Sequence, residues 1–121
     1  MTTADESVPE VGPEEGRALV DGGAVLLDVR EVDEWQAGHA AGAVFIPLGE
    51  VAARVNELRA NEPTADRRIV AICRAGGRSE RATRFLRAQG FDVVNLAGGM
   101  RAWAAAGLDV VTDDGQPGAV I

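Results

Sequence analysis

Short apolar runs alternate with polar and glycine-rich segments along the chain, and this alternation predicts strands separated by helices. Continuous apolar runs of four to eight residues are typical of strands buried on both faces. The expected strands cover residues 24–29, 44–46, 69–72 and 91–96. Strands separated by helices favour a parallel sheet, because each crossover must return over the sheet. The pattern therefore predicts an α/β fold.

Helix signals occupy the segments between these runs. Pro13 suits the first turn of a helix and Gly22 suits its end. Val51, Val55 and Leu58 fall on one face of another expected helix. The expected helices cover residues 13–21, 32–36, 48–59, 79–89 and 99–106, and a surface loop is expected over 61–66.

Length and composition bound the domain organisation. The 121 residues are enough for one core and too few for two, and 46% apolar with 26% charged residues is typical of a soluble globular protein. We expect an acidic flexible arm over residues 1–10, one domain over 11–111 and a loose tail over 112–121.

Few residues are available for cross-links or metal binding. Cys73 is the single cysteine and His39 the single histidine, which excludes an internal disulfide framework and argues against structural zinc. Residues 1–16 lack the basic start and apolar stretch of a secretory signal, and no window approaches the roughly 18 apolar residues of a membrane span. We expect a cytoplasmic protein without a metal or organic cofactor.

The net charge of −7 argues against nucleic acid or an acidic membrane as partner. Residues 1–66 carry 14 acids and 4 arginines, a net −10, whereas residues 67–121 carry 8 arginines and 5 acids, a net +3. Seven arginines lie close to Cys73: Arg67, Arg68, Arg74, Arg78, Arg81, Arg84 and Arg87. We interpret the last three as a solvated helix face.

The segment from Cys73 to Ser79 follows an expected strand and precedes an expected helix. Its two adjacent glycines allow a tight turn whose N–H groups point inward, and the start of the helix adds positive potential at the same place. Amides, helix dipole and arginine all favour a thiolate over a thiol. The loop predicts a nucleophilic cysteine that acts on an anionic substrate. The alternative is a buried structural cysteine.

Three segments together resemble one known family. They are residues 27–48, with Leu27-Asp28-Val29-Arg30-Glu31, Gly38-His39 and Gly42-Ala43; residues 73–79, CRAGGRS; and residues 96–107, with Leu96-Ala97-Gly98-Gly99-Met100 and Trp103. Their order and spacing resemble the rhodanese family, specifically the single-domain thiosulfate sulfurtransferase type. The resemblance runs from about Val11 to Val110.

The resemblance implies a three-layer fold with a mostly parallel sheet of about five strands, and a ping-pong sulfur transfer through a persulfide. It assigns catalysis to Cys73, anion binding to Arg74, Ala75, Gly76, Gly77, Arg78 and Ser79, and support to Asp28, Arg30, Gly98 and Gly99. The implied partners are a small anionic sulfur donor, a cyanide or thiol acceptor, or a protein sulfur donor or acceptor. We expect a monomer or weak homodimer.

Several alternatives stay open at this point. A rhodanese-like sulfur carrier or binding module would use the same cysteine. Arsenate reductases and phosphatases resemble this family but place five residues between cysteine and arginine, whereas four separate Cys73 from Arg78. Asp28 and Arg30 also suit an ion pair that fixes the end of a strand. His39 is interpreted as part of a structural turn rather than as a general base.

Overall fold

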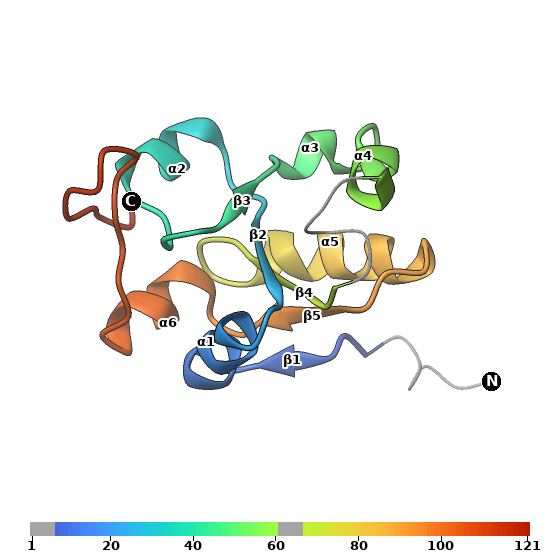
Figure 1. The fold of residues 1–121 in the computed structure, drawn as a ribbon, viewed down its shortest axis with the longest axis horizontal. Helices are drawn as coiled ribbons and strands as arrows, with labels where there is room; N and C mark the ends of the chain where they lie inside the picture. The colour runs from blue at the N-terminus through green and yellow to red at the C-terminus, as the bar shows by residue number, and fades with distance from the viewer. Residues whose placement is uncertain (1–6, 61–66) are drawn as a thin grey trace.

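The computed structural model describes residues 7–60 and 67–121, in which five parallel strands form one sheet (Figure 1). The strand order is β1-β5-β4-β2-β3. The strands are β1 (Glu10–Val11), β2 (Val25–Asp28), β3 (Val44–Phe45), β4 (Ile69–Ile72) and β5 (Val93–Leu96). Sequence reasoning missed β1. The expected loop over 61–66 and most of the expected acidic arm lie outside the described residues.

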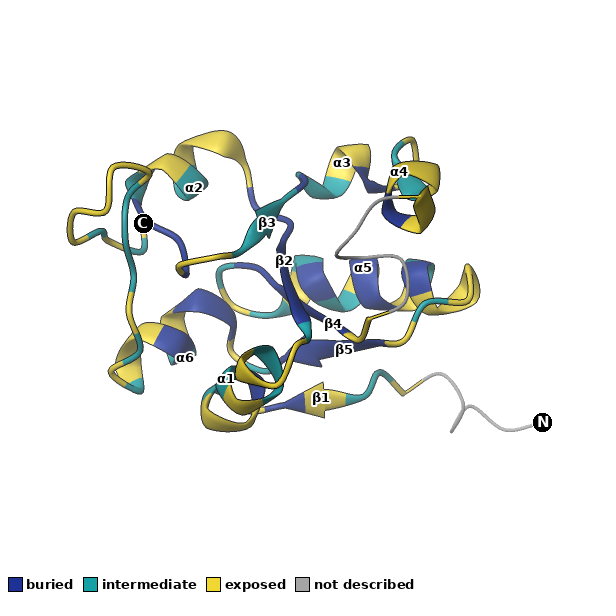
Figure 2. Cartoon of the chain, in the orientation of Figure 1, coloured by how far each residue is buried: buried dark blue, intermediate teal, exposed yellow. Residues whose placement is uncertain are grey.

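The three central strands are buried on both faces, as their apolar runs predict (Figure 2). Successive side chains point to opposite faces of a sheet. Leu27 and Ala71, which are register partners, face one core, while Leu26 and Val70 face the other. Each face of the sheet therefore needs a covering layer of helices.

Helices cover both faces, which confirms the three-layer α/β prediction (Figure 1). On one face lie α3 (Leu48–Val51), α4 (Val55–Ala60) and α5 (Gly77–Ala88); on the other lie α1 (Pro13–Asp21) and α6 (Gly99–Ala105). The short helix α2 (Val32–Ala37) packs beside β3, where Trp35 stacks on Phe45. No described helix has both the length and the apolar character needed to cross a membrane.

The helix expected over residues 48–59 is two helices in the structure. A turn at residues 52–54 separates α3 from α4, and Val51 and Leu58 are still buried in the same core. The sequence predicts one helix because the turn consists of Ala52, Ala53 and Arg54, which are all good helix formers. Core packing of the flanking residues overrides that local preference.

The tail expected to be loose is bound to the domain in the structure. Two backbone hydrogen bonds attach it: the N–H of Ala119 donates to the Ala37 carbonyl of α2, and the N–H of Gly118 donates to the carbonyl of Val110, next to Val111, which pairs with His39. A Cβ on Gly38 would lie 2.6 Å from the backbone nitrogen of Ala119, so the two backbones meet with no side chain between them. Gly118, one of the glycines on which the expectation of a loose tail rests, permits this close contact, because a Cβ there would lie 2.7 Å from the Gly38 Cα. The last residue of the tail, Ile121, lies beside Arg74.

Candidate active site

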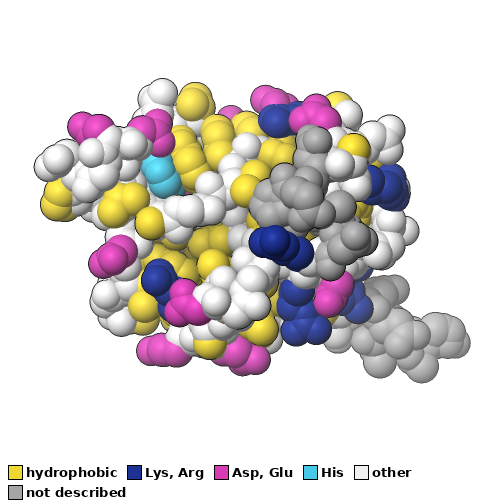
Figure 3. All heavy atoms as spheres, viewed as in Figure 1, with side chains coloured by type: hydrophobic (Ala, Val, Ile, Leu, Met, Phe, Trp, Pro, Cys, Tyr) yellow, Lys and Arg dark blue, Asp and Glu magenta, His cyan; other side chains and the backbone are white. Residues whose placement is uncertain are grey.

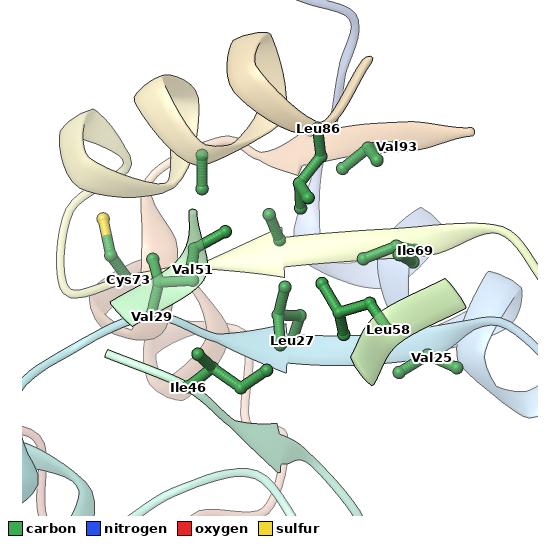
Figure 4. Close-up of a cluster of buried hydrophobic side chains, with 12 residues drawn as sticks. Val25, Leu27, Val29, Ile46, Val51, Leu58, Ile69, Cys73, Leu86 and Val93 are labelled. Atoms are coloured by element: carbon green, nitrogen blue, oxygen red, sulfur yellow. The ribbon is translucent and has the colours of Figure 1, made fainter. Parts of the chain in front are cut away.

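Cys73 lies just beyond the carboxyl end of β4, below the first turn of α5 (Figure 4). Its side chain packs in the core that includes Val29 and Val51, and the residue is 1% exposed. Ligands of parallel α/β sheets bind at the carboxyl ends of the strands. The structure therefore places the single thiol at the edge of the sheet where binding chemistry is expected.

Hydrogen-bond donors converge on the sulfur. The Gly76 N–H lies 3.1 Å from Cys73 Sγ and the Ser79 hydroxyl 3.3 Å from it. Burial raises the pKa of the Cys73 thiol, but hydrogen bonds from the Ser79 hydroxyl and from the N–H groups of Ser79, Gly76 and Ala75 lower it more, so the net pKa is lowered. The loop is therefore built to hold a thiolate.

The start of α6 holds the loop in this shape. The N–H of Met100 donates to the Cys73 carbonyl at 2.7 Å, and the N–H of Arg101 donates to the Arg74 carbonyl at 3.0 Å. These bonds engage the loop carbonyls, while the N–H groups of the loop face the sulfur. Gly99 has a φ of +60°, and a Cβ there would clash with the Cys73 carbonyl oxygen. Glycine is therefore required at this contact.

Gly76 gives the loop its turn. It has a φ of +112°, in the left-handed region that favours glycine, and it caps the start of α5. The following residue, Gly77, has no positive φ and an open environment around its Cα. Of the two adjacent glycines in the motif, only Gly76 is therefore demanded by backbone conformation.

Arg78 is paired with an acid that sequence reasoning did not select. Its Nη1 and Nη2 lie 2.7 Å and 2.9 Å from Oε1 and Oε2 of Glu34 on α2. This bidentate bond lowers the Glu34 pKa to about 2, against the opposing effect of burial. The same bond raises the pKa of Arg78, and the negative charge of the Cys73 thiolate raises it by a smaller amount. Arg78 thus fixes the loop to α2 while keeping its charge near the sulfur.

Arg74, the other arginine of the loop, contacts the tail. Its Nε donates to the Ile121 carbonyl at 2.8 Å, and the residue is partly exposed. Among the residues that the structure describes, no acidic side chain is paired with Arg74, whereas Arg78 is paired with Glu34. Arg74 is therefore the loop cation with the capacity to meet an incoming anion.

Asp28 and Arg30 form a fully buried ion pair. Arg30 Nη2 lies 2.8 Å from Asp28 Oδ2 and 2.8 Å from the Gly38 carbonyl, so the pair links the end of β2 to the segment after α2. Arg30 Nη1 is buried and has no hydrogen-bond partner among the described residues. These contacts match the interpretation of an ion pair that fixes a strand end.

His39 is engaged in structural contacts. Its ring stacks on Trp35 with 3.6 Å between centroids, Nδ1 lies 2.8 Å from the Trp35 carbonyl, and Nε2 lies 3.3 Å from an Asp113 carboxylate oxygen on the tail. Both ring nitrogens therefore have partners away from the thiol. This geometry agrees with the interpretation of His39 as part of a structural turn.

Only part of the arginine-rich stretch lies at the site. Arginine side chains gather toward the right-hand end of Figure 3, where Figure 1 shows the end of α5. Two surface hollows of about 610 and 420 Å³ lie there and share Gly90, Phe91 and Asp92 in their linings. The arginines that line them are Arg59, Arg67, Arg68, Arg84 and Arg87. Of the seven arginines near Cys73 in sequence, Arg74 and Arg78 belong to the loop.

Sequence reasoning missed one further polar residue at the site. Asn95 is fully buried in β5, and its Oδ1 accepts a hydrogen bond from Ser79 Oγ at 2.5 Å. Its Nδ2 donates to the Gly76 carbonyl at 3.2 Å. The available signal was a single amide within the apolar run of residues 93–96, since buried polar groups require partners.

Comparisons with known proteins give a consistent family assignment. The family model described as "Rhodanese-like domain" matches residues 12–106. The chain is 45% identical over 100 residues to the "putative sulfur carrier protein YrkF" of Bacillus subtilis, covering 80% of this chain and 51% of that protein. It is 32% identical over 96 residues to "thiosulfate sulfurtransferase GlpE" of Pseudomonas savastanoi, covering 78% of this chain and 86% of that protein.

The fold gives the same result. A solved structure of a rhodanese-related protein from Thermoplasma volcanium matches with a TM-score of 0.77 at 28% identity, covering 87% of this chain and 99% of that one. The chain spans about half the length of several curated relatives that it matches.

Proposed function

Because the chain belongs to the rhodanese-like domain family, we propose that it transfers a sulfane sulfur from thiosulfate, or a similar anionic donor, to a thiophilic acceptor through a persulfide on Cys73. The observation that carries this proposal is the convergence of the Gly76 N–H and the Ser79 hydroxyl on Cys73 Sγ. Donors at these positions favour the thiolate over the thiol, and the thiolate is the nucleophilic form of cysteine.

In the first half-reaction, the Cys73 thiolate attacks the outer sulfur of thiosulfate. The new S–S bond forms as the bond between the two donor sulfurs breaks, and sulfite leaves with the bonding electron pair. Total charge is conserved, because a thiolate and a thiosulfate dianion become a persulfide monoanion and a sulfite dianion. Arg74, which is partly exposed beside the loop, stabilises the negative charge that develops on the leaving sulfite.

In the second half-reaction, the acceptor attacks the outer sulfur of the persulfide. Cyanide takes this sulfur as thiocyanate, or a thiolate takes it as a new persulfide, and the electron pair of the broken S–S bond returns to Cys73. The inward N–H groups of the loop hold the outer sulfur's negative charge between the two steps. Cys73 is the chain's only cysteine, so the acceptor must come from outside it.

A sulfur-carrier function is the second candidate. It is favoured by the 1% exposure of Cys73 and by the relative named as a putative sulfur carrier. A carrier uses the same persulfide but receives its sulfur from a protein donor and turns over poorly with small molecules. The two functions therefore share the chemistry of Cys73 and differ in their donor and acceptor.

Steady-state kinetics with thiosulfate and cyanide test the enzymatic function. We expect thiocyanate to form over many turnovers, with parallel lines in double-reciprocal plots, and Cys73→Ser to abolish the reaction. Arg81→Ala, on the exposed face of α5, is the matched control and should retain activity. A single stoichiometric transfer without turnover would favour the carrier. Cys73-dependent hydrolysis of an aryl phosphate would contradict both functions.

A further inference from the structure

A buried row of polar groups leads away from the catalytic sulfur beneath α5. Ser79 Oγ lies 3.3 Å from Cys73 Sγ and 2.5 Å from Asn95 Oδ1. Ser79 and Asn95 are both fully buried. The row ends at Glu10 on the edge strand β1, whose Oε2 lies 3.0 Å from Asn95 Nδ2. The mechanism above uses the first member of this row and leaves Asn95 without a role.

The two hydrogen bonds that Asn95 Nδ2 donates fix the orientation of the amide. Nδ2 carries two hydrogens, and its two neighbours, the Glu10 carboxylate and the Gly76 carbonyl at 3.2 Å, can only accept. A flipped amide would place Oδ1 against two acceptors. Asn95 Oδ1 must therefore face the Ser79 hydroxyl.

The Ser79 hydroxyl has one hydrogen and competing acceptors. Asn95 Oδ1 at 2.5 Å and Cys73 Sγ at 3.3 Å both lie within reach, and the Gly76 carbonyl lies 3.3 Å away. A neutral thiol is a weak acceptor, whereas a thiolate is a strong one. The hydrogen therefore belongs to Asn95 when Cys73 is protonated, and formation of the thiolate draws it toward the sulfur.

We propose that Asn95 is a positioning residue that controls the thiolate of Cys73 by competing with the sulfur for the Ser79 hydroxyl hydrogen. Its part in catalysis rests on the proposed sulfur transfer. In the persulfide the negative charge moves to the outer sulfur, so Sγ accepts weakly and the hydrogen returns to Asn95. The hydroxyl thus stabilises the attacking thiolate and withdraws when the persulfide has formed.

Charged groups also surround this site. Arg74 lies in the loop, Arg78 lies in the first turn of α5 and pairs with Glu34 of α2, and Glu10 lies beyond Asn95 on β1. Within residues 7–60 and 67–121, none of these side chains has a hydrogen bond to Ser79 Oγ. Asn95 is therefore the side chain through which a substitution can redirect the hydroxyl.

The pH dependence of iodoacetamide alkylation, measured on the full chain, tests this proposal without any sulfur transfer. Asn95→Ala releases the hydroxyl to the sulfur, so at a pH below the thiol pKa alkylation should become about threefold to tenfold faster, which corresponds to roughly half to one pKa unit. Ser79→Ala should slow alkylation. Asn95→Ala added to Ser79→Ala should change nothing further.

The comparison of the two backgrounds decides the result. An unchanged or slower rate in Asn95→Ala, or an equal acceleration with and without the Ser79 hydroxyl, would overturn the proposal. Where Asn95→Ala does not fold, Asn95→Val fills more of the buried space in β5 and also removes the competing acceptor. It should speed alkylation when Ser79 is present and leave the rate of Ser79→Ala unchanged, and an equal change in both would also overturn the proposal.

This readout separates the proposal from the proposed function. If Asn95→Ala does not speed alkylation but the wild-type protein still forms thiocyanate, only the positioning role of Asn95 is disproved. If alkylation follows the expected pattern but the protein accepts no sulfur, the positioning role is supported and the sulfur-transfer function is disproved.

Discussion

Arg78 and Glu34 form a bidentate ion pair that joins the loop around Cys73 to α2, with nitrogen–oxygen distances of 2.7 and 2.9 Å. The two residues are 44 positions apart in the sequence. Glu34 also accepts a hydrogen bond from the Glu31 N–H, as part of the capping box of α2. The pair therefore ties the orientation of α2 to the shape of the loop that surrounds Cys73.

Glu34→Gln should destabilise the protein by about 1 to 2 kcal/mol at pH 7, a range that allows for the one-third exposure of the Arg78 side chain. The folded-state pKa of Glu34 is about 2 and its ordinary value is 4.5. The unfolded chain therefore binds more protons between these values, so the contribution is present above about pH 4.5 and is lost as the pH falls through 2. Urea unfolding at pH 7 and at pH 3 checks this. An equal loss at both pH values would contradict the assignment.

Gly99→Ala should destabilise the protein by about 2 to 4 kcal/mol, because it places a Cβ against the Cys73 carbonyl and puts alanine at a positive φ. Gly49→Ala is the matched control, since a Cβ there meets nothing within 4 Å and its φ is not positive. Thermal unfolding of the two variants measures the difference. Similar midpoints for both would show that the contact between α6 and the loop adapts without cost.

Arg74→Ala should lower kcat/KM for thiosulfate about threefold to tenfold while leaving the unfolding midpoint unchanged, because the Arg74 side chain is partly exposed and, among the described residues, hydrogen-bonds only to the backbone oxygen of Ile121. Arg81→Ala, an exposed arginine on α5, controls for the loss of one positive charge. An identical effect of both substitutions would assign the loss to net charge rather than to the loop.

Gly38→Ala should release the tail, because the added Cβ would lie 2.6 Å from the Ala119 nitrogen. The Ala119 amide donates to the Ala37 carbonyl, and its hydrogen-exchange rate should rise toward the rate of an unprotected amide. Exchange at the buried amides of β4 serves as the internal control. Continued protection of Ala119 in the variant would show that the tail is held by other contacts.

Much of the fold follows from short-range patterns. The apolar runs of β2, β4 and β5 and the helix signals around Pro13 predict an α/β fold with a parallel sheet, which the structure confirms. The loop from Cys73 to Ser79 can also be predicted from the sequence, because its thiol, glycines and arginines lie within seven consecutive residues. These features depend on residues that are close in sequence.

The features that sequence reasoning missed depend on residues distant in sequence. Glu34 reads as a capping acid of α2, and nothing local indicates that it binds Arg78. The tail is expected to be loose because it contains Gly115, Pro117 and Gly118, and nothing local in the sequence indicates that its backbone lies against Gly38. The two residues of β1 are too few to give a strand signal, and they pair with β5 only because the sheet has an open edge there.

The most direct measurement of the central claim is the intact mass of the reduced protein after incubation with thiosulfate. The proposed mechanism predicts one added sulfur on the wild-type chain, released by cyanide, and no addition to Cys73→Ser, because Cys73 is the only thiol. An unchanged mass in the wild type, or an equal addition to Cys73→Ser, would contradict it.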